Sequence, residues 1–268
     1  MEQGERRDPG VVARLHVEEA LGAGTAIALD RDRAHYLRNV LRAAPGDSVG
    51  LFNGRDGEWR ARIAAFAKHG AALEVEAQTR PQAPEPDLWL VFAPVKRARI
   101  DFIAEKATEL GASALVPVMT RRTVVTRVNL DRLRANAVEA AEQTERLSVP
   151  EIREAVSLDR LIADWPATRR LILCAEAGKA RPIAEALHAL ASESQESSGA
   201  SLGAWAVMTG PEGGFALAEL DGLANLPFVT AVGLGPRILR ADTAALAALA
   251  CFQAILGDGR VRPPVRLI

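Results

Sequence analysis

The chain has 268 residues, enough for one large domain or two smaller ones, and 49% of them are hydrophobic and 25% charged, as in an ordinary soluble protein with a sizeable core. The formal net charge of −1 excludes a protein that coats nucleic acid through bulk charge, so any RNA binding must come from local basic patches. No apolar run reaches the roughly 18 residues of a membrane span, and the opening MEQGERRDPG lacks the apolar segment of a secretory signal. We therefore expect a cytoplasmic protein with no membrane partner.

Residues 1–80 have a β-rich pattern with one helix, which is typical of a small β-barrel domain. A helix is predicted over residues 31–40, because Asp30 is a good N-cap. Strands are predicted at residues 48–52, 59–63 and 72–76, of which the last two alternate as half-buried strands do. Asn53-Gly54 and Asp56-Gly57 are hairpin signals between the first two of these strands.

Residues 81–86, PQAPEP, predict a stiff, extended linker, because their prolines continue neither a strand nor a helix. The pattern then changes to alternating strands and helices, which indicates a second domain, residues 87–268, with a parallel sheet covered on both faces. Strands are predicted at 88–93, 114–118, 171–175, 205–209 and 229–232, and helices at 99–110, 131–143, 182–190, 216–223 and 242–256. The low-complexity stretch 192–201 is expected to be a flexible insertion.

Two turns rich in glycine and proline follow the last two predicted strands, GPEGG at 210–214 and GLGP at 233–236. The first is not a nucleotide-binding P-loop, because it contains no GK[ST], and Pro236 and Ile238 break the dinucleotide fingerprint that GLGPRI begins. Glycine lets backbone N–H groups approach a ligand, and the ends of adjacent strands form the crevice where α/β sheets bind ligands. We interpret the turns together as one ligand site, although each alone is compatible with an ordinary strand-to-helix turn.

These turns carry a resemblance to a known family. GPEGG followed by LGPRILRADTA resembles the RsmE family, the 16S rRNA uridine-N3 methyltransferases of the SPOUT class. HYLRNVLRAAPGD at 35–47, followed by LFNG at 51–54, is similar to the family's N-terminal PUA-like domain, and residues 142–150 resemble its EQ…R…VP segment. The resemblance implies a SPOUT-type parallel sheet with a C-terminal trefoil knot, preceded by a small PUA-like β-barrel.

The resemblance also implies that both turns wrap S-adenosylmethionine. The residues it assigns to the cofactor are Thr209, Gly210, Pro211, Gly213, Val232, Gly233, Leu234, Gly235, Ile238, Leu239 and Thr243. Candidate catalytic residues are Arg240, Glu212 and Arg122, of which Arg122 lies in the basic segment that follows the strand at 114–118. Two alternatives remain open: Glu212 could instead cap the following helix, and Arg240 could be a surface side chain paired with Asp242.

Candidate RNA contacts are Arg14, Arg38, Arg42 and Arg146, although each could equally be a solvated surface arginine. No metal site is expected, because Cys174 and Cys251 sit in apolar runs typical of buried free thiols. The four histidines have no Ser, Cys or metal-ligand partner at a useful spacing, so a hydrolase triad is unsupported as well.

We therefore expect an S-adenosylmethionine-dependent enzyme that methylates uracil N3 in 16S rRNA, with the small ribosomal subunit rather than DNA as its partner. A homodimer is also expected, because the predicted helix 243–256 is apolar nearly all round and must be covered on most faces. The alternatives are a methyltransferase of the same class acting on another RNA position, such as a ribose 2′-hydroxyl, and a non-catalytic RNA-binding protein with the same fold.

Overall fold

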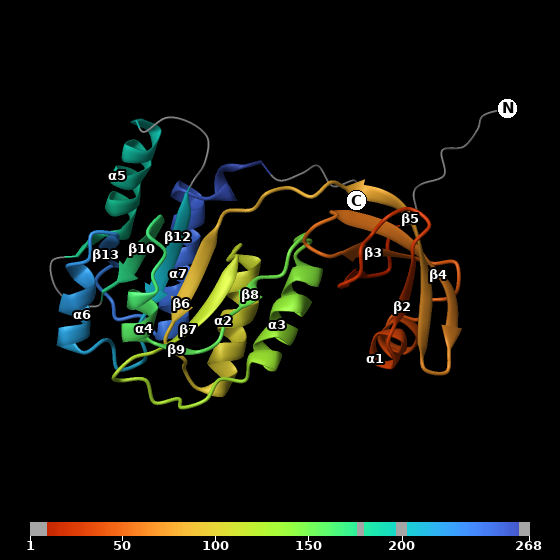
Figure 1. Ribbon diagram of the computed structural model, residues 1–268, viewed down its shortest axis with the longest axis horizontal. Helices are drawn as coiled ribbons and strands as arrows, with labels where there is room; N and C mark the ends of the chain where they lie inside the picture. Colours follow the sequence, from red (N-terminus) through yellow and green to blue (C-terminus); the bar gives the residue numbers. More distant parts are fainter. Residues whose placement is uncertain (1–9, 176–179, 197–202, 263–268) are drawn as a thin grey trace. The chain divides into compact units, whose positions relative to one another are not determined.

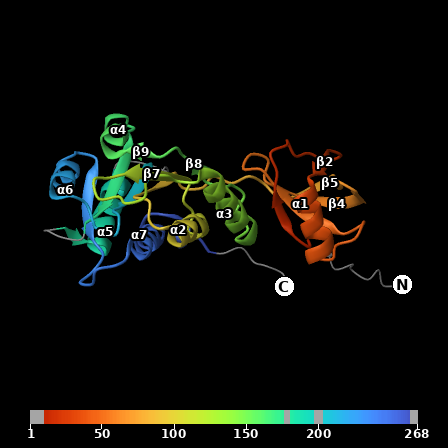
Figure 2. The same cartoon turned by 90° about the horizontal axis from the view of Figure 1, so that it is seen from below.

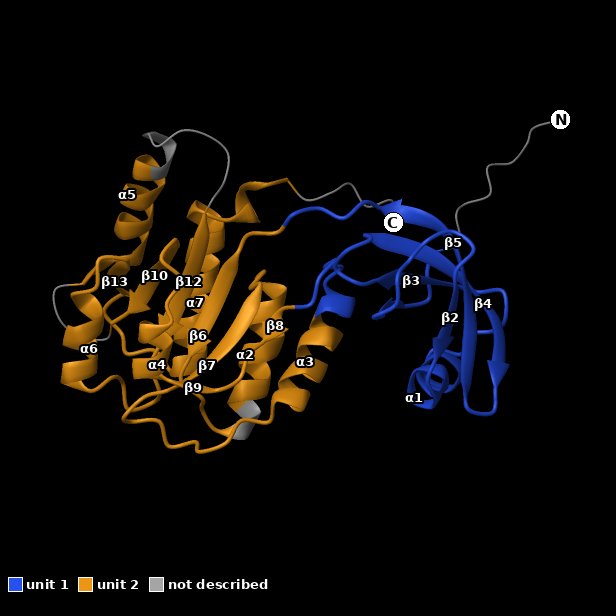
Figure 3. Cartoon of the chain, viewed as in Figure 1, with its two compact units in different colours: residues 1–84, 141–149 blue, residues 85–140, 150–268 orange. Residues whose placement is uncertain are grey.

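The computed structural model describes residues 10–175, 180–196 and 203–262. The chain forms two compact units, of which unit 1 comprises residues 1–84 and 141–149 and unit 2 comprises 85–140 and 150–268 (Figure 3). The first boundary lies inside the proline-rich segment that the sequence singles out. The second differs from the predicted division, because residues 141–149, assigned from the sequence to the second domain, belong to unit 1.

Unit 1 is built on a five-stranded sheet in the order β1-β3-β4-β5-β2 (Figure 1). Its strands are β1 (Arg14–His16), β2 (Ala26–Leu29), β3 (Ser48–Phe52), β4 (Glu58–Ala67) and β5 (Gly70–Arg80). β1 runs parallel to β3, and the other pairs are antiparallel. The predicted helix is present as α1 (Arg31–His35), continued by a π-helical turn (Tyr36–Val40), and Asp30 caps it by accepting the Arg33 N–H at 2.8 Å.

The hairpin signals between β3 and β4 form a tight, internally bonded loop. The Oδ1 of Asn53 accepts the N–H groups of Arg55 and Asp56 at 3.0 and 2.9 Å, as an Asx turn does. Gly57 has a φ of +78°, and a Cβ there would collide with the carbonyl of Arg80, so this position requires glycine.

Residues 141–149 join unit 1 because they complete its polar and apolar contacts. The Arg14 guanidinium donates to the carbonyls of Ala141, Glu142 and Arg146 at 3.1, 3.0 and 2.8 Å. These are carbonyls at and beyond the end of α3 (Leu130–Gln143), where a helix leaves acceptors free. The side chain of Leu147 packs with Phe52 in a small apolar cluster.

Unit 2 contains an eight-stranded parallel sheet in the order β11-β13-β10-β12-β6-β7-β8, with β9 also paired to β7. Its strands are β6 (Leu88–Phe92), β7 (Ala114–Met119), β8 (Glu151–Ile152), β9 (Val156–Ser157), β10 (Arg169–Cys174), β11 (Arg181–Pro182), β12 (Ala204–Thr209) and β13 (Val229–Gly233). The five strands predicted for this region are confirmed, and the two-residue strands β8, β9 and β11 were not predicted.

Helices cover both faces of this sheet, as the alternating pattern predicts (Figure 2). α2 (Arg97–Glu109), α5 (Ile183–Glu196) and α7 (Ala241–Ile255) pack together on one face, while α4 (Leu158–Ala163) and α6 (Leu217–Ala224) lie on the other. α5 extends into the predicted insertion at 192–201, of which residues 197–202 lie outside the described residues. Among the described residues no helix is both long and apolar enough to cross a membrane. The trefoil knot stays a prediction.

Candidate active site

A cavity of about 90 Å³ lies at the carboxyl ends of β10 and β12, under the loop that joins β13 to α7. This is the edge at which an open parallel sheet binds ligands. The residues that line the cavity are Cys174, Ala175, Thr209, Gly210, Leu234, Gly235, Pro236, Arg237, Ile238, Leu239, Ala241 and Ala244. The two glycine-rich turns therefore contribute to one cavity.

The cavity brings together six of the residues assigned to the cofactor from the sequence: Thr209, Gly210, Leu234, Gly235, Ile238 and Leu239. The other five, Pro211, Gly213, Val232, Gly233 and Thr243, do not line it. Sequence reasoning missed Cys174 and Ala175, which end β10. The sequence could not reveal their place, because β10 comes before β12 and β13 in the chain and lies between them only in the folded sheet.

Glycine conformations shape both turns. Gly210 packs against the ring of Phe215, where an added Cβ would sit 3.1 Å from the ring carbons. Gly214 has a φ of +65°, and its N–H donates to the carbonyl of Pro211 at 2.9 Å. Gly235 has a φ of +100°, and an added Cβ there would meet no atom within 4 Å. Glycine is therefore required at Gly235 by backbone conformation rather than by crowding.

Cys174 is a buried thiol on the cavity wall. Burial raises its pKa to about 12, with a further contribution from Cys251. The thiol is therefore protonated at neutral pH and contributes an uncharged, weakly polar surface.

Arg240 lies at the rim of the cavity as the N-cap residue of α7, and its side chain is exposed. The suggestion that Arg240 pairs with Asp242 is wrong. The Asp242 carboxylate instead lies 3.9 Å from the Nε of Arg99 and also accepts the Thr243 N–H. Within the described part of the chain, Arg240 has no ion pair, so its guanidinium is available to a ligand.

Glu212 is exposed and does not cap α6, which corrects the alternative suggested by its position before the helix. The helix begins at Leu217, and the carboxylate of Glu219 accepts the N–H of Ala216 at 2.9 Å. Among the described residues, Glu212 has no hydrogen bond or ion pair.

Arg122 lies in a turn after β7 that points to the same edge of the sheet. The Thr120 N–H donates to Thr123 Oγ1 at 3.0 Å, and their hydroxyls are 2.8 Å apart, so the turn is closed on itself. Arg122 Nη1 donates to the carbonyl of Gly213 at 2.9 Å, which connects this turn to the GPEGG loop.

The four arginines predicted to contact RNA have different environments in unit 1. The Arg14 side chain is only 10% exposed, and its guanidinium is held by Glu58 and by backbone carbonyls. Arg146 donates to Ser148 Oγ at 3.2 Å. Arg38 and Arg42 are exposed, and Arg42 has a φ of 59°, in the left-handed region. These last two are therefore the accessible members of the set.

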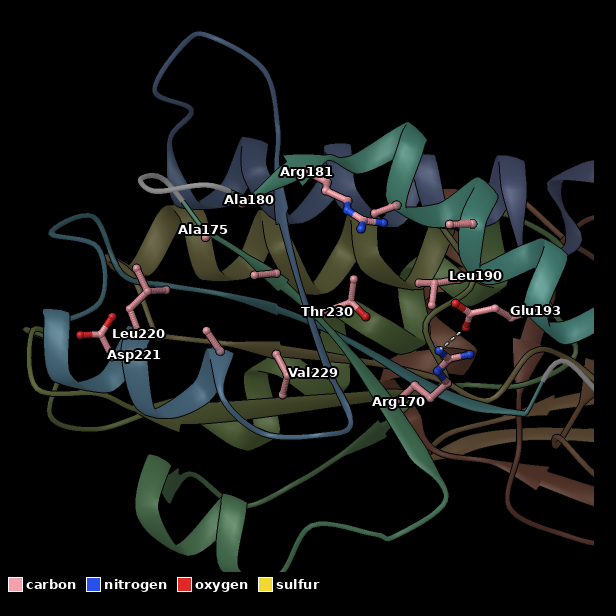
Figure 4. A pocket seen from close by; sticks show the side chains of 14 residues that line it. Arg170, Ala175, Ala180, Arg181, Leu190, Glu193, Leu220, Asp221, Val229 and Thr230 are labelled. Carbon is pink, nitrogen blue, oxygen red and sulfur yellow. Dashed lines mark hydrogen bonds and ion pairs between the residues drawn. The ribbon is translucent and has the colours of Figure 1, made fainter.

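A larger pocket of about 590 Å³ runs along β13 between α5 and α6 (Figure 4). Its charged side chains include Arg170 and Glu193, which pair with each other at 3.0 Å. None of the residues assigned to a site from the sequence lines this pocket, although it shares Ala175 with the smaller cavity. No group of three or more metal-ligating side chains is found among the described residues.

Comparison with known proteins defines the class. A family model described as an RNA methyltransferase domain matches residues 82–253, and a second, described as an RNA methyltransferase PUA domain, matches residues 29–76. The first match covers most of unit 2 and the cavity described above. The chain therefore belongs to the RNA methyltransferase family.

The relatives point to one branch of that family. The chain is 32% identical to the ribosomal RNA small subunit methyltransferase E of Rickettsia conorii, over 88% of this chain and 93% of the relative. It is 33% identical to the Synechocystis protein of the same name, over 92% and 77%. The crystal structure of the Neisseria gonorrhoeae ribosomal RNA small subunit methyltransferase E bound to S-adenosyl methionine superposes with a TM-score of 0.79 at 29% identity, covering 92% of this chain and 98% of that one.

Proposed function

We propose that this protein transfers the methyl group of S-adenosylmethionine to N3 of a uracil in 16S rRNA, in the cytoplasm and in the context of the small ribosomal subunit. The observation that carries the proposal is the cavity at the strand ends, which is lined by residues of both family-like turns. The names of the relatives, and the cofactor bound to the Neisseria structure, support both the substrate and the methyl donor.

The cavity suits S-adenosylmethionine in its chemistry. Leu234, Ile238 and Leu239 offer apolar surface for a flat adenine ring. Ala241 and Ala244, at the start of α7, keep the helix surface small where it faces the cavity. When bound there, the cofactor supplies a methyl group on a positively charged sulfur.

The exposed groups at the rim suit the uracil. N3 must lose its proton, and the resulting negative charge spreads onto the ring oxygens. Arg240 and Arg122 can stabilise that charge through planar, multiply donating guanidinium groups. Glu212 is an exposed carboxylate at this edge with no hydrogen bond or ion pair among the described residues, so it could accept the N3 proton. Holding the reactants in line contributes ~7–11 kcal/mol in favourable cases, and a general base a further ~10²–10⁴-fold in rate.

We assign RNA capture in unit 1 to Arg38 and Arg42, with Arg146 as a further candidate. Arg14 is left out of this set, because its guanidinium already donates hydrogen bonds to Glu58 and to backbone carbonyls within residues 141–146. A few exposed arginines are enough to position an RNA backbone, whereas the net charge of −1 provides no general attraction.

The test is methyl transfer from radiolabelled S-adenosylmethionine to 16S rRNA and to small subunits, followed by nucleoside analysis. Label in 3-methyluridine supports the proposal. Label in a 2′-O-methylated nucleoside would instead identify a methyltransferase of another specificity. Calorimetric binding of the cofactor without any transfer to either substrate would favour a non-catalytic RNA-binding protein.

A further inference from the structure

We propose that Glu219 is a positioning residue for methyl transfer, because it fixes the loop that carries Glu212 against the turn that carries Arg122. This inference rests on the proposed function. It concerns the loop of residues 210–216, between β12 and α6, and the turn of residues 120–123 after β7.

The carboxylate of Glu219 bonds to both segments at once. Oε2 accepts the N–H of Ala216 at 2.9 Å, and Oε1 accepts the N–H of Arg121 at 2.8 Å. The first contact is local capping of α6, whereas the second reaches a residue 98 positions away in the sequence. Capping of α6 needs only the hydrogen bond from Ala216 to Oε2. The hydrogen bond from Arg121 to Oε1 therefore has a different role. Hydrogen bonds from N–H groups to a carboxylate are stronger than those between neutral groups.

A second contact between the same two parts of the chain also has the 120–123 turn as its donor. Arg122 donates to the carbonyl of Gly213 at 2.9 Å, and its Cβ and Cδ lie 3.6 and 3.7 Å from the position that a Cβ on Gly213 would take. Glu219 accepts from the turn, and the turn's Arg122 donates to the loop. The turn therefore holds Gly213 of the loop directly and Ala216 of the loop through Glu219 in α6, on either side of Phe215 in the sequence.

The 120–123 turn is more rigid than the 210–216 loop, so contacts between them can fix the conformation of the loop. The 120–123 turn is closed internally by the Thr120 and Thr123 hydroxyls. The 210–216 loop contains three glycines, and Gly213 is exposed. Phe215 is buried in the core and fixes one side of the loop only. Without the turn, the Glu212–Gly213 segment would keep the conformational freedom that glycine confers.

Loss of the Glu219 contact should change the orientation of the reacting groups rather than the affinity for the cofactor. Glu219 does not line the cofactor cavity, so its replacement removes no residue of the cavity wall. A displacement of about 1 Å at a reacting group can cost ~100-fold in rate. Loss of the contact should therefore lower kcat by at least ~10-fold and leave cofactor affinity within about threefold.

The experiment compares three variants in the full-length protein. Glu219→Ala removes both hydrogen bonds. Ala216→Pro removes only the local cap, because proline lacks an N–H and the φ of −67° at Ala216 is the angle that proline prefers. Glu185→Ala is the matched control, an exposed glutamate in the first turn of α5. For each we would measure kcat and KM for rRNA, cofactor affinity by calorimetry, and amide hydrogen exchange in 120–123 and 210–216.

The proposal requires a loss of kcat in Glu219→Ala alone, with near-normal cofactor affinity and faster exchange confined to these two segments. Equal losses in Glu219→Ala and Ala216→Pro would show that Glu219 only caps α6, and an unchanged kcat in Glu219→Ala would also overturn the proposal. A parallel fall of cofactor affinity would mean that Glu219 supports the cavity itself. Failure of the wild-type protein to methylate rRNA would instead defeat the proposed function.

Discussion

At the scale of single residues, the central question is whether Arg240, the exposed arginine at the start of α7, contacts the substrate. Arg240 is exposed at the rim, while the neighbouring Asp242 is engaged by Arg99 and by the Thr243 N–H. An exposed guanidinium with no ion pair among the described residues can contact a bound ligand without first breaking a contact within the protein. This availability favours a contact with the substrate over a surface ion pair.

We expect Arg240→Lys to lower the rate of rRNA methylation by at least ~10-fold, or ~1.4 kcal/mol of transition-state stabilisation. Lysine keeps the charge but not the planar fork that can bind two oxygens at once. Cofactor affinity should be nearly unchanged. Single-turnover methylation and calorimetry measure both, with Arg160→Lys on the exposed face of α4 as a control. A near-normal rate would remove Arg240 from the catalytic residues.

At the scale of elements, Glu58 on β4 and Arg14 on β1 connect the sheet of unit 1 to residues 141–149. Glu58 accepts from Arg14 at 2.5 Å and from Arg80 at 2.8 Å, and only 13% of its side chain is exposed. Burial alone would raise the pKa of Glu58, but the hydrogen bonds from Arg80 and Arg14 outweigh it and hold the pKa below its ordinary value. The Arg14–Glu58 pair is therefore a structural centre of unit 1, that is, a buried ion pair whose hydrogen bonds connect several segments of the unit.

We expect Arg14→Met to lower the free energy of unfolding by about 2–4 kcal/mol, because it leaves a buried carboxylate with one donor fewer and several carbonyls without theirs. Arg62→Met breaks exposed ion pairs with Glu74 and Glu76 and should cost less than about 1 kcal/mol. Urea titrations followed by fluorescence compare the two. Equal costs would show that Arg14 is not a structural centre.

The Arg14–Glu58 pair also predicts how the stability of unit 1 changes with pH. A carboxyl group whose pKa is lowered by folding stabilises the native state fully above its unfolded pKa, here 4.5, and loses that contribution as the pH falls through the folded value. Wild-type unit 1 should therefore lose stability below about pH 4.5. Arg14→Met should lose less over the same range, since it removes part of what lowers the pKa.

The main elements of unit 2 could be predicted from the sequence because each is specified locally. β6 is a continuous apolar run, and α7 is a long alanine-rich helix, so both were located to within about a residue. The two-residue strands β8, β9 and β11 exist only because a neighbouring strand pairs with them, and such short segments have no periodicity to read. The assignment of 141–149 to unit 1 depends on Arg14 and on Phe52, far away in the sequence.

The candidate site was predictable to the extent that it is made of turns. Thr209 directly precedes one glycine-rich turn and Leu234 lies within the other, and both residues line the cavity. Cys174 and Ala175 end a strand that carries no turn chemistry of its own. Their role follows from the strand order, which places β10 between β12 and β13. Glu219 was missed for a similar reason, because its partner at Arg121 is set by tertiary packing.

At the scale of the whole molecule, α7 is buried on one side only. The residues that its packing against α2, α5 and the sheet buries are Ala241, Ala245, Ala248, Leu249, Phe252 and Gln253. Thr243, Ala250 and Ala254 are exposed, and Ala247 is half-buried. These four share one face of the helix, because they are spaced by four, three and four residues. A second copy of the chain could approach this small-residue face closely.

We therefore expect the protein to be a homodimer at micromolar concentration, with the exposed face of α7 in the interface. Ala250→Glu places a charge at the centre of this face, so burying it against a second copy would cost several kcal/mol unless the charge is paired. The variant should sediment as a monomer and methylate rRNA more slowly. Ala184→Glu, at an exposed alanine on α5, is the matched control and should remain dimeric. A wild-type monomer in sedimentation, or an Ala250→Glu variant that stays dimeric, would place the interface elsewhere or remove it.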